Sequence, residues 1–511
     1  MTQRPAGEMT DLARIEAVLD QPEVSSAIRE LEERLLTGVR PRQCSARTLF
    51  VGMCACLKEG HRSAHLTAVH AALCRLEEDD QLRLGVLAPW KAGPHLLTYR
   101  QVEYTMGRVA AVLSKQRPDG APSTDLQKLC DALLEASIPE RFAGTTSSYA
   151  IDWTDVASFS RPPGEPEGPC ADPEAAWGHR RGDGPGQRDE LFFGYYGSVM
   201  TMVRDEHGTA VPELIRRVQL SSCRHDPVPS FVAVVTNAAA TGAVVTDVLA
   251  DSGYAYKVPE HFALPLRAIG ARLVIDLHPN DRGMKGTFAG AICANGNLYC
   301  PSTPKALFSL GPLSRGASEA DVAAHDDKTA ELSRYKLGRI SADDDDGYHR
   351  VSCPAVMGKL RCPLRPTSMA LDFERPEVLT PPEHPPTCCA QKSVTVPPQV
   401  NAKTAQRHDY PSAAWRSSYG RRSAVERSNS RLKDPAGINL DVRGWCKLMG
   451  FTPLGLFLAC AGVVVNFGLA DAFEAHEVAE ALRRSPPLPR PRPRRRRTLA
   501  DLVATGTVAP P

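Results

Sequence analysis

Four side chains near the C-terminal end of the sequence are spaced so that a helix would bring them to one face. Tyr419, Arg422, Glu426 and Lys433 follow one another at intervals of three, four and seven residues. At about 100° per residue, their directions fall within a stripe roughly 60° wide if the helix is unbroken from Tyr419. One carboxylate would then lie between two cations and a phenol, an arrangement suited to a metal ion and a phosphate. A solvated helix with internal ion pairs has the same pattern and is the alternative interpretation.

Basic residues surround Glu426 over a wider segment. Residues 403–447 carry ten Lys or Arg and four Asp or Glu, a local net charge of +6. Residues 483–497 add eight Arg and no acid, so subtracting both segments from the total of +2 leaves −12 on the rest. A basic segment that contains one well-placed carboxylate is typical of a phosphate-binding surface. The near-neutral total therefore does not exclude a nucleic acid as the partner.

Two aspartates accompany short apolar runs that predict strands. Asp152 lies in the run Tyr149–Trp153, and Asp251 directly follows the run Val244–Ala250. A carboxylate at the end of a strand can bind a metal ion, but it can equally be a turn or helix-capping residue. Asp155 competes with Asp152 for the same role, although it lies past the predicted end of the strand. Taken alone, neither aspartate decides between these interpretations.

Together, these residues resemble the DDE transposases of one large group of bacterial insertion sequences. The signature Tyr-x2-Arg-x3-Glu-x6-Lys of that group matches Tyr419, Arg422, Glu426 and Lys433 at every position. Its two Asp motifs are similar to Asp152-x-Thr154 and to Asp251-x-Gly253-Tyr254. The resemblance covers about residues 147–470. It implies an α/β fold, with a ribonuclease-H-like mixed sheet, flanking helices and an insertion between Asp251 and Glu426.

The resemblance also implies a function and a set of roles. The protein would be a transposase that cuts and rejoins DNA at the ends of a mobile insertion sequence. Asp152, Asp251 and Glu426 would hold two Mg²⁺ ions, for which Mn²⁺ can substitute. Tyr419, Arg422 and Lys433 would bind phosphates near the cut end. The implied partners are the double-stranded DNA of the terminal repeats and of the target, with a homodimer when two ends are paired.

Three other functions remain open at this stage. A ribonuclease-H-like endonuclease would cut without strand transfer, and a catalytically silent DNA-binding protein would only bind. A membrane protein would use the apolar stretch Leu448–Leu469, which approaches membrane-spanning length. That stretch contains Pro453 and Asn466, so a buried core helix is the preferred interpretation. The first residues contain no apolar run typical of a signal peptide, and we expect a cytoplasmic, nucleoid-associated protein without a membrane partner.

The composition and hydrophobic periodicity of the sequence predict six segments. Residues 1–116 are expected to form an all-α DNA-binding domain, 117–146 a linker, and 147–278 the first part of the catalytic domain. Residues 279–417 would be a Cys-rich insertion of strands and loops, 418–482 the last part of the catalytic domain, and 483–511 a disordered Pro/Arg-rich tail. The first catalytic part predicts strands near 149–153, 191–203, 211–220, 244–250 and 271–277. Helices are predicted near 229–243 and 258–269, and an exposed loop over 159–190.

Six of the fifteen cysteines lie in the predicted insertion. Thiolates on loops can hold structural zinc, and Cys300, Cys353, Cys362 and Cys388 are the predicted ligands. Their spacing is not the paired Cys-x2-Cys pattern, so buried or incidental thiols are the alternative.

Overall fold

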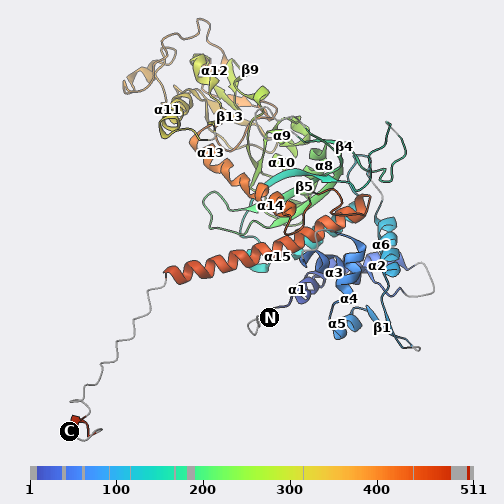
Figure 1. Cartoon of the computed structure of the whole chain (residues 1–511). Coiled ribbons are helices and arrows are strands. Elements are labelled where there is room, and N and C mark those ends of the chain that lie inside the picture. Colours follow the sequence, from blue (N-terminus) through green and yellow to red (C-terminus); the bar gives the residue numbers. More distant parts are fainter. Residues whose placement is uncertain are drawn as a thin grey trace. The chain divides into compact units, whose positions relative to one another are not determined.

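The computed structural model describes residues 9–36, 42–59, 64–90, 93–114, 117–165, 168–180, 190–314, 316–440, 442–484 and 503–506. The chain divides into two compact units, Met1–Ala470 and Asp471–Pro511. The elements described below belong to the first unit, except for the end of the last helix (Figure 1).

A six-stranded mixed sheet forms the centre of the first unit. Its strands are β3 (Ser148–Ala157), β4 (Ala176–Arg180), β5 (Glu190–Val203), β6 (Ile215–Ser222), β7 (Asp247–Ala250) and β8 (Arg272–Ile275). Neighbouring strands follow the order β4-β5-β3-β7-β8, and β6 pairs with β5. β3, β4 and β6 run antiparallel to β5, whereas β7 is parallel to β3 and β8 is parallel to β7. The predicted α/β class with a mixed sheet is confirmed.

Three helices connect the parallel strands. α8 (Pro227–Ala240) packs on β5 and β6, and short α9 (Ser252–Ala255) follows β7 directly. α10 (Ala263–Ala268) packs on β8, after a 3-10 helix at Pro259–His261. The single helix predicted over 258–269 is therefore broken at Phe262, whose φ of −137° does not continue a helix.

The N-terminal elements are mostly helical. They are α1 (Asp11–Leu19), α2 (Pro22–Leu35), α3 (Ala46–Lys58), α4 (Leu66–Cys74), α5 (Glu78–Arg83), β1 (Leu87–Trp90), β2 (Gly93–Leu96) and α6 (Tyr99–Leu113). In α2, Val24, Ile28, Leu31 and Leu35 are buried at the spacing of one helix face. The antiparallel hairpin β1–β2 shows that this segment is not all-α as predicted. The predicted linker contains the helix α7 (Thr124–Ala136), which packs on α2 and β6.

The segment between α10 and the last helices holds two small three-stranded sheets. One comprises β9 (Met284–Phe288), β10 (Ala291–Ala294) and β11 (Asn297–Tyr299). The other comprises β12 (Gly338–Arg339), β13 (His349–Ser352) and β14 (Val394–Val396). The strands agree with the predicted insertion, but α11 (Glu319–Tyr335) and α12 (Thr387–Ala390) were not predicted. 3-10 helices lie at Pro279–Asp281, Lys305–Ser309 and Pro366–Ala370.

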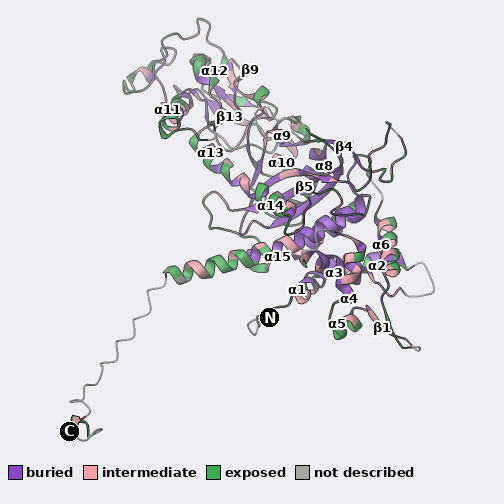
Figure 2. Ribbon diagram, in the orientation of Figure 1, coloured by how far each residue is buried: buried purple, intermediate pink, exposed green. Residues whose placement is uncertain are grey.

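The chain then returns to the central sheet through α13 (Ala413–Tyr419), a 3-10 turn at Gly420–Arg422, and α14 (Ser423–Lys433). α13 packs on β8, and α14 packs on β3 and β5. α15 (Phe451–Arg484) is buried over most of Phe451–Ala470 and exposed over most of its later residues (Figure 2). Among the described residues, one helix, Phe451–Ala481, is long and apolar enough to cross a membrane, and 78% of its apolar window is buried inside the protein. This burial agrees with the predicted core helix.

The predicted tail, 483–511, lies outside the described residues except for the end of α15 and residues 503–506.

Candidate active site

The two predicted aspartates lie at matching positions on neighbouring parallel strands. The parallel register pairs Ala150 of β3 with Leu249 of β7, so Asp152 and Asp251 each lie two residues beyond a paired residue. Asp152 is inside β3, opposite Val199 of β5, and Asp251 comes directly after β7. The pairing of the strands therefore brings the two carboxylates to one level of the sheet.

Asp251 is held by the start of α9. Its Oδ1 accepts hydrogen bonds from the backbone N–H groups of Gly253 (2.9 Å) and Tyr254 (3.3 Å). A Cβ atom at position 253 would lie 2.8 Å from Trp153 Cη2 and 3.1 Å from Asp251 Oδ1, which leaves no room for a side chain. The capping interpretation of Asp251 is thus confirmed, and it leaves Oδ2 of the same carboxylate for another ligand.

Glu426 lies on α14, and Arg422 links it to Asp152. The Arg422 Nη1 atom lies 3.5 Å from Asp152 Oδ2, and Arg422 Nη2 forms an ion pair with Glu426 Oε1. Only 14% of the Arg422 side chain is exposed, compared with 18% for Asp152 and 49% for Glu426. One buried guanidinium therefore joins two of the three predicted catalytic carboxylates.

The surroundings of Asp152 oppose the ionisation of its carboxyl group. Burial and, after it, the charge of Asp251 raise the pKa of Asp152 to about 7, and Arg422 only partly offsets these two effects. Glu426 acts in the same direction as Asp251. The three carboxylates thus share one electrostatic environment with more negative charge than Arg422 balances.

Tyr419 is the last residue of α13, the helix before α14, and lies beside Arg422. Its ring is stacked on Trp415, with centroids 4.9 Å apart and an interplanar angle of 12°. The Arg422 guanidinium lies 5.7 Å from the centre of the Tyr419 ring, within cation–π range. Because a 3-10 turn separates Tyr419 from α14, the predicted face is formed by two consecutive helical segments rather than by one unbroken α-helix.

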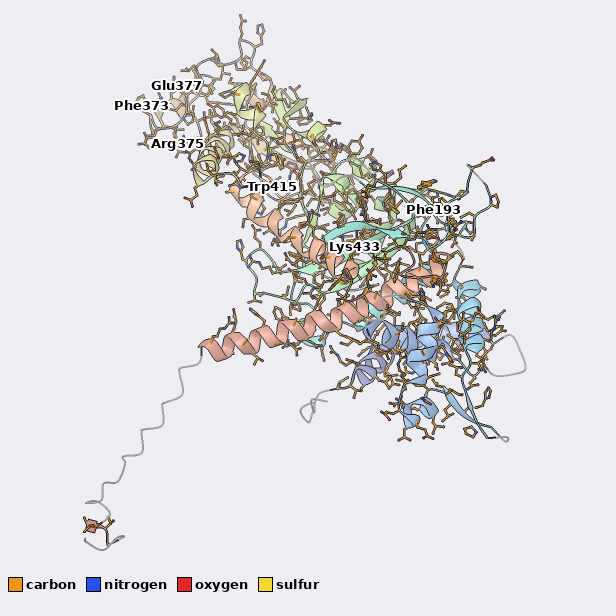
Figure 3. The ribbon with its side chains drawn as sticks, viewed as in Figure 1. Phe193, Phe373, Arg375, Glu377, Trp415 and Lys433 are labelled. Carbon is orange, nitrogen blue, oxygen red and sulfur yellow. The ribbon has the colours of Figure 1, made fainter. Side chains whose placement is uncertain are left out.

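Lys433 lies on α14 (Figure 3), where its Nζ is 3.1 Å from Asp155 Oδ1. Arg180 of β4 donates to the same carboxylate through Nε at 3.1 Å. Burial opposes ionisation of Asp155, but these two cations outweigh it and lower the pKa of Asp155. Asp155 lies inside β3, and not past the end of the strand as predicted. Two cations neutralise it, whereas Asp152 is only partly compensated by Arg422.

Two residues at the site were missed in the sequence. Asn429 donates from Nδ2 to Asp152 Oδ2 at 3.4 Å, and its position three residues after Glu426 on one helix face was a usable signal. Arg180 belongs to β4, which lies inside the region predicted as an exposed loop, so that prediction was wrong. The Gly- and Pro-rich flanks of β4 gave no signal for a strand that pairs with the start of β5.

The carboxylates suit a hard divalent cation in their chemistry. Arg422 Nη1 and Asn429 Oδ1 are buried here without a hydrogen-bond partner, which indicates unused polar capacity at the site. Among the described residues, no three His, Cys, Asp or Glu side chains are grouped closely enough to hold a metal ion as they stand. Metal binding at Asp152, Asp251 and Glu426 therefore requires their side chains to move together.

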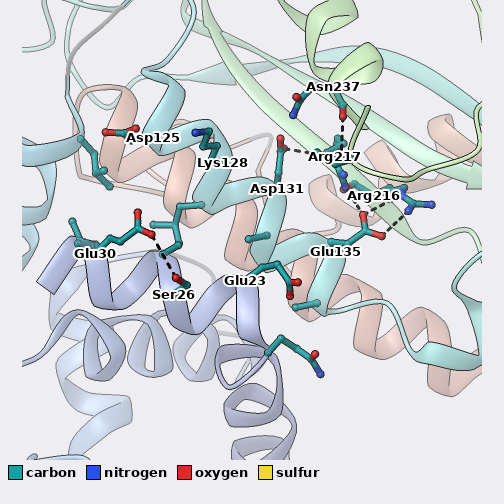
Figure 4. A pocket seen from close by; sticks show the side chains of 18 of the residues that line it. Glu23, Ser26, Glu30, Asp125, Lys128, Asp131, Glu135, Arg216, Arg217 and Asn237 are labelled. Carbon is teal, nitrogen blue, oxygen red and sulfur yellow. Dashed lines mark hydrogen bonds and ion pairs between the residues drawn. The ribbon is translucent and has the colours of Figure 1, made fainter. Parts of the chain in front are cut away.

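A cavity of about 590 Å³ lies elsewhere in the first unit, between α2, α7, β6 and α8. Its polar wall is an ion-pair group in which Arg217 contacts Asp131 and Glu135, and Arg216 also contacts Glu135 (Figure 4). Burial raises the pKa of Asp131 to about 6, although Arg217 opposes this change. None of the predicted catalytic residues lines this cavity.

Comparison with known protein families, with curated proteins and with solved structures found no match to this chain.

Proposed function

We propose that the protein is a DDE-type transposase that cuts DNA at the ends of a mobile insertion sequence and joins the cut ends to a target. The observation that carries the proposal is the meeting of Asp152, Asp251 and Glu426 around Arg422. These residues come from three segments that are far apart in the sequence. Such a grouping suits phosphodiester chemistry, which needs several oxygen ligands for divalent ions at one place.

The order of the strands supports a ribonuclease-H-like sheet as the finer form of this fold. Along the chain, β3, β5 and β6 form an antiparallel series, and β7 and β8 then add on the other side of β3 in parallel. Asp152 lies on the first of these strands and Asp251 directly after β7. α14, which carries Glu426, packs across β3 and β5. We infer that β4 is an addition to the edge of β5.

The residues of the site have distinct proposed roles. Asp152, Asp251 and Glu426 would hold two divalent ions, Mg²⁺ or Mn²⁺, which when bound activate the attacking hydroxyl and stabilise the leaving oxygen. Arg422 and Tyr419 would bind a phosphate of the DNA end beside these carboxylates. Lys433 would do the same by exchanging Asp155 for a phosphate oxygen.

The proposed partners follow from this activity. Double-stranded DNA of the element ends and of the target would occupy the site, and two chains would act together when two ends are paired. Residues 1–116 would recognise the ends, and the Arg-rich residues 483–497 would add affinity that depends on salt. The protein would act in the cytoplasm, at the nucleoid.

The test is DNA cleavage by a Glu426→Gln variant. The substrate is a plasmid that carries the coding sequence with its natural flanking DNA, incubated with Mg²⁺ or Mn²⁺. Cleavage should fall below about 1% of the wild-type rate, while affinity for the end fragment changes less than about threefold, because the metal ligand and not the DNA surface is removed. Glu213→Gln is the matched control, since Glu213 forms an ion pair with Arg427 on the same helix but does not contact the aspartates.

The outcomes separate the competing functions. Cleavage by wild type with strand transfer of pre-cut ends supports a transposase, whereas cleavage without strand transfer supports an endonuclease. End binding without cleavage by the wild type in either metal supports a silent DNA-binding protein. Normal cleavage by Glu426→Gln refutes the assignment of Glu426.

A further inference from the structure

The insertion brings four buried cysteines together from separate segments. Cys300 directly follows β11, Cys353 directly follows β13, Cys362 lies in the next loop, and Cys388 belongs to α12. Each is at most 7% exposed, and every cysteine of the protein is a free thiol. These are the four thiols that the sequence singled out, and the proposed transposase chemistry does not use them.

Three of the four share the same local structure. Cys300, Cys353 and Cys362 each precede a proline, and their carbonyl oxygens accept backbone hydrogen bonds from Thr303, Met357 and Arg365 at 2.8–3.0 Å. Each cysteine therefore begins a tight turn.

Backbone donors point at two of the sulfurs. The Cys300 sulfur accepts from the N–H of Ser302, and the Cys362 sulfur accepts from the N–H of Leu364, in each case two residues further along the chain. Such hydrogen bonds favour the thiolate over the thiol. Burial nevertheless raises the pKa of Cys300 to about 12.

The thiols lie close enough to interact with one another. The Cys300 sulfur interacts electrostatically with those of Cys353, Cys362 and Cys389, and the Cys388 sulfur interacts with those of Cys300 and Cys353. Cys388 and Cys389 are 4.0 Å apart, and their hydrogen bond lowers the pKa of Cys388 while it raises that of Cys389. Cys388 is the more deeply buried member of this pair, 3% exposed compared with 7% for Cys389.

The cysteines are divided between two hydrophobic clusters that a bound cation could connect. Cys300, Cys353 and Cys362 belong to one small hydrophobic cluster, whereas Cys388 and Cys389 belong to a second cluster. Leu364 packs against both. The strands of this segment have only two to five residues, so regular hydrogen bonding contributes little to its stability.

We propose that Cys300, Cys353, Cys362 and Cys388 bind one Zn²⁺ ion that ties the two clusters of the insertion together. Four thiolates in a tetrahedral arrangement are a closed, structural zinc site. Each ligand loses its proton as its Zn–S bond of about 2.3 Å forms, so the step needs no oxidant or reductant. As placed, no three of these described side chains are at ligand distances, so binding must draw the sulfurs together.

The test is the zinc content of the full chain, purified from zinc-supplemented cells without a metal-binding tag. The wild type should contain about one zinc per chain by mass spectrometry of the elements, and Cys353→Ser should contain less than about 0.2. Cys293→Ser is the matched control and should keep its zinc, because Cys293 is half-buried on β10 in the same insertion and burial alone raises its pKa. Glu426→Gln should also keep it, which separates this site from the carboxylates.

A second measurement covers the case in which Cys353→Ser does not fold. A mercurial reagent titrated into the wild type should release the zinc in step with the modification of about four thiols, as a dye for free zinc reports. Wild type that stays zinc-free after reduction and reconstitution overturns the proposal, as does equal zinc in Cys353→Ser and Cys293→Ser. Loss of zinc from Cys389→Ser but not from Cys388→Ser overturns the assignment of the fourth ligand.

Discussion

Replacing Asp152 with Asn should stabilise the metal-free protein, by an amount that grows with pH. The ionised carboxylate is disfavoured by burial and by the charge of Asp251, and Arg422 compensates for only part of this cost. The pKa of Asp152 rises from its ordinary value of 3.8 to about 7. At about 1.4 kcal/mol per pKa unit, this difference corresponds to about 4 kcal/mol of folding free energy.

The direction follows from proton binding. The unfolded chain releases the proton of Asp152 near pH 3.8, whereas the folded protein keeps it until about pH 7. Between these values the folded state binds more protons, so wild-type stability falls as the pH rises. The Asp152→Asn variant lacks this loss. Its advantage should be small at pH 4 and reach about 2–4 kcal/mol at pH 8, the lower figure allowing for the lost ion pair with Arg422.

The assay is urea denaturation in EDTA at half-unit steps between pH 3 and pH 8.5. Asp155→Asn is the control with the opposite sign, because Arg180 and Lys433 outweigh burial and lower the pKa of Asp155. Its stabilising contribution is present above the ordinary pKa and is lost as the pH falls through the folded value. That variant should therefore be less stable than wild type at pH 8, and the deficit should shrink toward pH 3.

A pH-independent difference between wild type and Asp152→Asn would refute the reasoning, and so would a destabilised variant at pH 8. In the second case, the ion pair with Arg422 would outweigh burial and the repulsion from Asp251. Addition of Mg²⁺ gives an independent reading of the proposed metal site. The metal should stabilise the wild type by about 1.4 kcal/mol at ten times its dissociation constant, and should stabilise the variant less.

Three further substitutions probe packing and buried hydrogen bonds. Asn466→Leu should cost about 3 kcal/mol in urea denaturation, because the fully buried Asn466 amide satisfies both a backbone N–H and a carbonyl of β6 at 2.7–2.8 Å. Tyr195→Phe should cost about 1–3 kcal/mol in the same assay, since it removes the 2.6 Å hydrogen bond to the buried carboxylate of Asp172; an unchanged midpoint would contradict this. Gly253→Ala should lower the rate of divalent-dependent cleavage while the protein stays folded at the assay temperature, because the added methyl group displaces Trp153 beside the carboxylates.

Part of the central sheet could be predicted because its strands are compact apolar runs. The hairpin over 191–203 and 211–220 appears as β5 and β6, and the run before Asp251 appears as β7. Strands and helices alternate after residue 229, a pattern typical of parallel pairing, and β7 and β8 are indeed parallel. Asp152 and Asp251 were recognisable because the first interrupts such a run and the second directly follows one.

Other elements could not be predicted from periodicity. α11 is a 17-residue helix with a largely polar sequence, so it carries almost no apolar stripe. Its start does have a signal, the reciprocal hydrogen bonds of Ser318 and Asp321, which form a capping box. The ion pairs of Arg422 and Lys433 depend on how α14 crosses the sheet, and sequence spacing along one helix does not contain that information.

The long insertion between Asp251 and Glu426 raises the question of what positions the second carboxylate-bearing segment. The returning chain is fixed to the sheet before α14 begins. Arg407 donates its backbone N–H to Leu273 of β8 at 2.8 Å, and Trp415 Nε1 donates to the carbonyl of Ile275 at 2.9 Å. Arg407 and Arg421 both form ion pairs with the buried carboxylate of Asp247, at the start of β7.

These contacts attach the segment just before Glu426 to the same two strands that position Asp251. A buried carboxylate needs its cations, so Asp247 ties the two halves of the site together more strongly than an exposed pair would. The insertion, which is long and has its own small cores, also contacts this returning segment, through the ion pair of Asp326 on α11 with Arg416 on α13. The placement of Glu426 thus depends on the attachment of residues 407–421 to β7 and β8 and on the packing of α14 on β3 and β5.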